Sequence, residues 1–439
     1  MALTITGNSI LDLASIQAMS ILYLSEAVLP LVKWKEIDDP LIAGLEAPPP
    51  AAWYEKAAGT KLKMANDIVK PSMIATGFSI QTLSRLAEIL PKYRVDSYLS
   101  KSTLHQKWQI ISALQLEFCL EYLEENPFST IDSAAVLEGG VWFLKTKSSL
   151  EGVRDFTANL AAIHQSIPEN LDPYNASTLE IASAIRGITV WYKHNNSDDG
   201  DDMLSTLVLE VLNRKSQSGL FHYGPYGRAS VPMGQQFFIL DSLLQAYSYV
   251  KLDYVLEEVF DIFSNLYNIA YKDALQIFTF KQKSISYTAF EIATLLSCLD
   301  KIAVYSNDNS EQRTMINQII DTFLEFLTQS YMEFHEGGVR KLLKWICISH
   351  ECKVGIENKP SIRTLFPKRI CLRYPGPEIS WDRKAITNQA DIFFLCSTLL
   401  DFLNEDFTHT NKDSNSNTEL PALNTLSMLF DLLNLTKGS

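Results

Sequence analysis

Helix-like segments that begin near a polar residue recur along this chain at a nearly constant spacing. They begin at about Asp132, Thr178, Gln235, Tyr287, Val339 and Gln389, in steps of 46, 57, 52, 52 and 50 residues. A step of about fifty residues accommodates one helical hairpin, and repeats of this length are typical of arrays or closed rings. The spacing therefore predicts an all-α protein of about six helical hairpins.

The helices within a hairpin differ in character. Segments 235–250 and 284–299 are apolar on almost every side, as expected of helices that are buried all round. Segments 253–271 and 311–332 carry charge on one face and apolar residues on the other. Buried inner helices that alternate with amphipathic outer helices predict an α/α toroid. An open α-solenoid is the alternative, because it uses the same hairpins without closing into a ring.

The regular hairpin spacing begins near residue 126 and so divides the chain into two parts. Residues 1–125 form an N-terminal helical segment that is expected to pack on the ring or complete it, and residues 126–439 form the toroid. Segment 351–380 contains four prolines and is predicted to be an irregular excursion, because long loops in compact domains are uncommon and often functional. Segment 407–420 is polar and is expected to be mobile.

Charge and composition exclude several classes of protein. The net charge is −13, which disfavours binding to nucleic acid or to anionic membranes, although the stretch 353–383 is locally basic. The N-terminus lacks the basic region and cleavage pattern of a secretory signal, and no apolar run is long enough to span a membrane. The six cysteines are sparse, as is usual in a reducing compartment. We expect a cytoplasmic protein.

A resemblance to a known superfamily rests on residues 217–271. The stretch Gly219-Leu220-Phe221 is a glycine-aromatic turn, Gly234-Gln235 begins a helix, Asp241 follows within the next turns, and Ala246-Tyr247 lies near the helix end. This segment resembles the hairpins of the (α/α)6 toroid enzymes, which include glycoside hydrolases and the N-acylglucosamine 2-epimerase group. The resemblance implies a toroid fold and an enzyme that acts on carbohydrate.

The loops that lead into the inner helices supply the candidate substrate-binding residues. In a toroid these loops meet at one rim, where helix N-termini offer unpaired N–H groups. Aromatic faces beside amides and charged groups suit a polyhydroxylated ligand. The candidates are His222, Tyr223, Tyr226, Arg228, Gln235, Gln236, Tyr287, Trp381, Arg383 and Gln389.

Acidic residues near the same rim are the candidates for catalysis. Hydrolysis of a glycosidic bond needs two carboxyl groups, one protonated and one ionised. The carboxylates on successive inner helices are Asp241, Glu291, Glu336, Asp382 and Asp391, of which the first four form the predicted catalytic set. Glu291 lies in an apolar helix, so it is either functional or satisfied by a neighbour. An epimerase would instead need two bases, and His222, His335 and His350 are available.

Two further patterns indicate alternative chemistry. Cys347, His350 and Cys352, with Cys371 farther along, are residue types that bind zinc, and they faintly resemble the site of lanthionine-forming cyclases. The adjacent Cys-His-Gly of those enzymes is missing, however, so no metal or other cofactor is predicted. The acidic run 195–202 contains the Asp-Asp-x-x-Asp pattern of isoprenoid enzymes, but its glycine makes a helix-linking turn the simpler interpretation.

These observations favour an enzyme that acts on a carbohydrate or another polyhydroxylated small molecule by general acid/base catalysis, resembling a glycoside hydrolase or a sugar epimerase. A non-catalytic helical-repeat binding protein is the first alternative. A zinc-dependent lanthionine-cyclase-like enzyme or an isoprenoid-cyclising enzyme is the second. The expected partner is a small-molecule substrate, without nucleic acid or membrane insertion, and a homodimer is compatible with the sequence.

Overall fold

The computed structural model describes most of the predicted helical region. The main described ranges are 71–89, 104–146, 155–196, 201–225, 230–272, 286–306, 311–328 and 389–403, with short pieces at 10–11, 13–15, 17–18, 28–30, 50–53, 92, 277–278, 370–373 and 376–378. Among the described helices, none combines the length and apolar character needed to cross a membrane.

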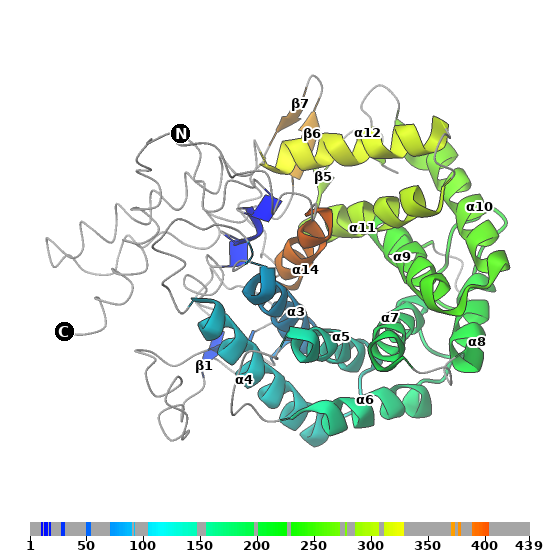
Figure 1. Cartoon of the computed structure of the whole chain (residues 1–439). Coiled ribbons are helices and arrows are strands. Elements are labelled where there is room, and N and C mark those ends of the chain that lie inside the picture. The colour runs from blue at the N-terminus through cyan, green and yellow to red at the C-terminus, as the bar shows by residue number, and fades with distance from the viewer. Residues whose placement is uncertain are drawn as a thin grey trace, which may run out of the picture.

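Six helices form an inner ring in which each contacts the next (Figure 1). They are α3 (Met73–Ile89), α5 (Thr130–Thr146), α7 (Thr178–Asn195), α9 (Met233–Val250), α11 (Ala289–Tyr305) and α14 (Gln389–Leu399). The ring closes because α14 packs against α3. The toroid prediction is confirmed, and closure rules out the open solenoid.

The outer layer consists of the return helices (Figure 1). They are α4 (Leu104–Glu125), α6 (Thr157–Asn170), α8 (Asp201–Leu212), α10 (Asp253–Ala270) and α12 (Glu311–Phe326). Short strands accompany them: β1 (Val28–Pro30), β2 (Pro50–Trp53), β3 (Tyr271–Lys272), β4 (Ile277–Phe278), β5 (Ser286–Tyr287), β6 (Ile370–Arg373) and β7 (Gly376–Glu378). In the three-stranded sheet, β6 lies between β5 and β7 and is antiparallel to both.

The sequence explains where the inner helices begin and end. Ser177 and Thr288 cap α7 and α11, and in each case a glutamate three residues later completes a capping box. Helices α7 and α9 end at Asn196 and Lys251, both with positive φ. These caps pair backbone groups at the helix ends that would otherwise need water or another partner.

Burial follows the predicted division into inner and outer helices. In α11, eleven of the residues are buried, on every side of the helix. In α10, by contrast, the buried residues are Val255, Val259, Ile262, Phe263, Leu266 and Ala270, which form one stripe. Outer helices therefore bury a single face, while the inner ring forms the core.

The identity of the sixth inner helix corrects the sequence interpretation. The expected inner segment at Val339 lies outside the described residues, and α11 packs directly against α14. The ring is completed instead by α3, from the segment before residue 126. Helix α3 begins at Met73, 57 residues before Thr130, so the same spacing continues backward along the chain. The expected excursion 351–380 is described only at β6 and β7, and segment 407–420 lies outside the described residues.

Glycines bring α3 and α5 into close backbone contact. A Cβ at Gly77 would lie 2.4 Å from the Ala135 carbonyl oxygen, and a Cβ at Gly139 would lie 2.4 Å from that of Gly77. Both clashes are with backbone, which cannot move away as the end of a flexible side chain can. The close packing of α3 against α5 therefore requires glycine on both helices.

We expect Gly77→Ala to lower the free energy of unfolding by about 1–3 kcal/mol, because it forces the two helices apart. Intrinsic helix propensity alone would give the opposite sign, since alanine favours a helix over glycine. Chemical denaturation measures the change. Gly224→Ala is the control, because a Cβ at Gly224 meets no heavy atom within 4 Å. Equal stability of the two variants would contradict this packing of α3 in the ring.

Candidate functional site

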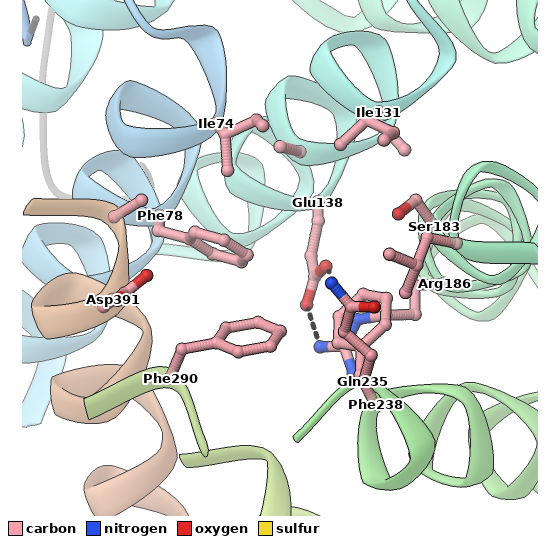
Figure 2. Close-up of a pocket in the computed structure, with 14 residues that line it drawn as sticks. Ile74, Phe78, Ile131, Glu138, Ser183, Arg186, Gln235, Phe238, Phe290 and Asp391 are labelled. Atoms are coloured by element: carbon pink, nitrogen blue, oxygen red, sulfur yellow. Dashed lines mark hydrogen bonds and ion pairs between the residues drawn. The ribbon is translucent and has the colours of Figure 1, made fainter. Parts of the chain in front are cut away.

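A cavity of about 240 Å³ opens among the first turns of the inner helices. All six inner helices contribute residues to its lining, which is mainly apolar (Figure 2). Three phenylalanines, Phe78, Phe238 and Phe290, supply aromatic faces. The polar lining residues are Glu138, Ser183, Arg186, Gln235 and Asp391. The N-terminal end of the ring is thus a small aromatic chamber with a few polar groups.

Phe394 packs against the three phenylalanines that line the cavity. Its ring centroid is 4.7 Å from that of Phe78 and 5.8 Å from that of Phe290. Centroids of Phe238 and Phe290 are also 5.8 Å apart. Contacts of this kind hold aromatic rings in fixed orientations. The wall therefore offers rigid faces on which a ligand ring can stack.

A buried ionic network lies beside this cavity. The Arg186 guanidinium donates to both Glu138 oxygens, the shorter distance being 2.9 Å, and it also donates to Asp241. Asp241 in turn accepts from Ser297 Oγ at 2.8 Å and from Lys301 Nζ at 2.5 Å. Four inner helices, α5, α7, α9 and α11, are joined by this chain of charges.

The charges of the network compensate one another. Burial acts to raise the pKa of Asp241, but the nearby Lys301 and Arg186 charges outweigh it and hold the pKa below its usual value. Arg186 is buried against Glu138 and Asp241, and its pKa is raised by their charges despite burial. Asp241, a predicted catalytic residue, is therefore an ionised member of the network and does not line the cavity.

Asp391 is the exceptional carboxyl group of the chamber. It lies in the first turn of α14 and lines the cavity. Burial, together with the charge of Glu291, raises the pKa of Asp391 to about 7. Glu138 lines the same cavity from α5 and has a cationic partner in Arg186. Two carboxyl groups in contrasting environments thus share one chamber.

Gln235 and Gln236 are neighbours in sequence with different surroundings. Gln236 accepts from the backbone N–H of Phe221 at 2.9 Å and donates to the carbonyls of Phe221 and Val231. Gln235 lines the cavity, and its Oε1 atom is buried without a hydrogen-bond partner among the described residues. An unpaired buried acceptor costs free energy unless a ligand or water satisfies it.

Several predicted site residues have structural contacts instead. Glu291 accepts from the backbone N–H of Thr288 at 2.7 Å, which closes the capping box of α11. Tyr287 is buried, and its ring meets Phe323 edge-on at 5.6 Å. The carbonyls of His222 and Tyr223 accept from the hydroxyl and backbone N–H of Thr178. The loop before α9 is thereby fastened to the start of α7.

Other predicted residues lie outside the described part of the chain. They are Tyr226, Arg228, Glu336, Cys347, His350, Cys352, Trp381, Asp382 and Arg383. Of Cys371 and Gln389 only the backbone is described, in β6 and at the start of α14. Among the residues that the structure describes, no group of three or more metal-binding side chains occurs.

Two residues that the sequence singled out line the chamber. They are Gln235, from the predicted binding set, and Asp391, from the wider group of candidate carboxylates. Glu138 and Arg186 were not predicted, although each is the one charged residue in the middle turns of its inner helix. A single charge in the middle of an inner helix is the signal that would have identified both.

Comparisons with known proteins identify similar structures but no family. No protein-family model matches this sequence, and no curated protein matches it. An unsaturated glucuronyl hydrolase specific for heparin matches over 89% of this chain and 95% of its own, with 12% identity and a TM-score of 0.51. An unsaturated glucuronyl hydrolase from Streptococcus agalactiae covers 90% of each chain, with 10% identity and a TM-score of 0.53.

A family 76 glycoside hydrolase from a bovine Bacteroides thetaiotaomicron strain is also similar. It covers 90% of this chain and 78% of its own, with 8% identity and a TM-score of 0.52. These proteins are α/α toroids. At such identities the likeness establishes the shared fold, in agreement with the resemblance drawn from residues 217–271.

Proposed function

We propose that this protein is an enzyme that hydrolyses a glycosidic bond in a carbohydrate or another polyhydroxylated small molecule, in the chamber at the N-terminal end of the ring. The observation that carries the proposal is a carboxyl group, Asp391, whose pKa of about 7 keeps it partly protonated near neutral pH inside an aromatic cavity. The structurally similar proteins include glycoside hydrolases and glucuronyl hydrolases, which supports this reaction class.

The proposed chemistry divides the work between two carboxyl groups. Asp391 donates its proton to the leaving oxygen as the bond between carbon and that oxygen breaks. Glu138, paired with Arg186, stabilises the positive charge that develops on the sugar ring. Water then supplies the hydroxyl group to the carbon and returns a proton to Asp391. A proton donor and a second carboxyl group in a contrasting environment are the arrangement that acid/base hydrolysis requires.

The remaining lining residues suit a sugar ring. Phe78, Phe238 and Phe290 offer apolar faces for the ring, while Ser183 and Gln235 offer polar groups at its edge. His222, the one described residue among the three histidines considered for an epimerase, does not line the chamber.

Assays of hydrolysis across a panel of aryl glycosides and unsaturated uronides test the proposal. We expect turnover of at least one class, with loss of turnover in Asp391→Asn. Turnover that survives unchanged in Asp391→Asn and in Glu138→Gln would refute the assignment of the site.

Gln235 and its neighbour provide a matched pair of variants. We expect Gln235→Leu to weaken binding of the substrate by about tenfold or more, because the ligand loses its acceptor, while the melting temperature stays the same or rises. We expect Gln236→Leu to lower the free energy of unfolding by about 2–3 kcal/mol, because buried backbone groups of Phe221 and Val231 lose their partner. Calorimetry of binding and thermal unfolding separate the two effects. Destabilisation by Gln235→Leu of the same size would contradict the role given to its side chain.

We further propose a cytoplasmic location and a small-molecule substrate. The described cysteines, Cys119, Cys298 and Cys396, are buried free thiols, which suits a reducing compartment. A homodimer is likewise a proposal, and sedimentation of the purified protein tests it.

A further inference from the structure

A second cavity, of about 320 Å³, lies among the later turns of the inner helices. Glu138 and Arg186 line both this cavity and the chamber described above, so the ion pair stands between them. The first cavity is mainly apolar, whereas this one is lined by charged side chains. Its chemistry therefore differs from that of the proposed active site.

Five cationic side chains line the second cavity: Arg85, Lys145, Arg186, Lys193 and Lys301. Glu138 and Asp401 are the acidic lining residues, and Asp241 lies behind them in the ionic network. Positive charge exceeds negative charge in this lining. The excess is unexpected in a chain whose net charge is −13.

Three of the cations have carboxylate partners. Arg186 pairs with Glu138 and Asp241, and Lys301 pairs with Asp241 at 2.5 Å. Arg85 pairs with Asp401 at 2.5 Å. These three form the fixed wall of the cavity.

Lys145 and Lys193 have no carboxylate within salt-bridge distance among the described residues. The Lys145 ammonium lies over the Trp142 ring, 4.7 Å from its centroid, and the Arg85 guanidinium is the same distance from that ring. Among the described residues, Lys193 donates to the Ser248 hydroxyl alone. Both lysines, from α5 and α7, are exposed residues that line the cavity without a salt bridge to any described residue.

The electrostatic surroundings of both lysines are unfavourable for charge. Burial and the charges of Lys301, Lys251 and Lys145 lower the pKa of Lys193 to about 8. Burial and the charge of Arg85 lower the pKa of Lys145, although Glu88 acts in the opposite direction. The negative ends of the helix dipoles favour cations here and act against an anion. The pKa of each lysine is nevertheless lowered, and a bound anion would relieve the repulsion among the cations.

We propose that the second cavity binds a small molecule carrying a phosphate, sulfate or carboxylate group, with Lys145 and Lys193 as the charged contacts. The cavity exceeds the size of an inorganic anion, and Trp142 and Tyr305 in its lining provide apolar surface for the rest of such a molecule. This site lies apart from Asp391 and goes beyond the proposed hydrolysis.

Calorimetric titration of the full chain with inorganic phosphate, sulfate, citrate and a sugar phosphate, at neutral pH and low ionic strength, tests the proposal. We expect at least one of these anions to bind. Lys145→Met and Lys193→Met should each weaken binding about tenfold, because a charge-assisted hydrogen bond is lost. A sugar phosphate that binds more tightly than phosphate identifies an organic ligand, and equal affinities identify the free anion.

Matched variants separate the site from general electrostatics. Lys215→Met removes the same charge from a pair with Glu258 in the outer layer and should leave binding unchanged. Lys193→Arg retains the charge and should retain binding. Because the substitutions relieve repulsion, we expect both methionine variants to melt at or above the wild-type temperature. Anion binding that is absent from the wild type, or equal in wild type and in the double variant Lys145→Met/Lys193→Met, would overturn the proposal.

Discussion

Replacing Asp391 with asparagine is expected to reduce turnover by about 10²- to 10⁴-fold, because the leaving oxygen loses its proton donor. The same change is expected to stabilise the protein at alkaline pH. The pKa of Asp391 is about 7 in the folded chain and near 3.8 when exposed, so the wild type loses stability as pH rises between these values. Well below pH 3.8 the carboxyl group is protonated in both states and the effect vanishes.

The expected gain for Asp391→Asn at pH 8 is about 2–4 kcal/mol, reduced from the full linkage value because the side chain is only partly buried. Thermal unfolding at pH 4 and at pH 8 measures it, beside assays of turnover. Asp261→Asn, on the exposed face of α10, removes the same charge and should change neither property. A loss of stability at pH 8 in Asp391→Asn would show that the carboxylate is favourably paired in the folded chain.

Replacing Arg186 with methionine is expected to lower the free energy of unfolding by about 3–5 kcal/mol, the second large effect. The side chains of Arg186, Glu138 and Asp241 are 8%, 6% and 1% exposed, so the variant leaves Glu138 buried without its cation. Asp241 retains Lys301 and Ser297. Most of the decrease in the free energy of unfolding is therefore expected to come from the unpaired Glu138.

The loss of stability in Arg186→Met can come from the unpaired Glu138 or from lost packing, and its pH dependence distinguishes the two. Without the guanidinium, Glu138 is a buried side chain that is costly only in its charged form, so the added instability should be small at low pH and grow as pH rises. The double variant Glu138→Gln/Arg186→Met should recover part of the loss. Lys92→Met, which breaks an exposed pair with Glu88, is the control and should cost less than about 1 kcal/mol. A defect that is equal at all pH values would contradict the electrostatic account.

The sequence predicted the ring but missed one of its members. Regular spacing located α5, α7, α9, α11 and α14, and all-round apolarity, which arises from burial on every side, marked α9 and α11. Helix α3 lies in segment 1–125, which was expected to pack on the ring or complete it, but no inner helix was assigned there. Gly77 and Gly139 are the reason that it fits there, and close backbone approach leaves no periodic pattern in the sequence.

The site was less predictable than the fold. Glu291 was chosen because an acid in an apolar helix suggested function, yet its position three residues after Thr288 serves the capping box. Glu138, Arg186, Asp241 and Lys301 are charged residues on four different inner helices. Their pairing depends on how those helices are rotated about their axes, which local sequence does not specify. Burial acts to raise the pKa of both Asp391 and Asp241, but nearby cations outweigh it at Asp241, whereas the charge of Glu291 adds to it at Asp391.

The central claim is that the chamber holds a carboxyl group that titrates near neutral pH. Carbon-13 NMR of protein labelled at aspartate carboxyl groups, compared with the Asp391→Asn variant to assign the signal, measures this titration directly. We predict that the Asp391 signal titrates with an apparent pKa near 7 and that this pKa is lower in Glu291→Gln. A signal that titrates near pH 4, with the same pKa in Glu291→Gln, would contradict this claim.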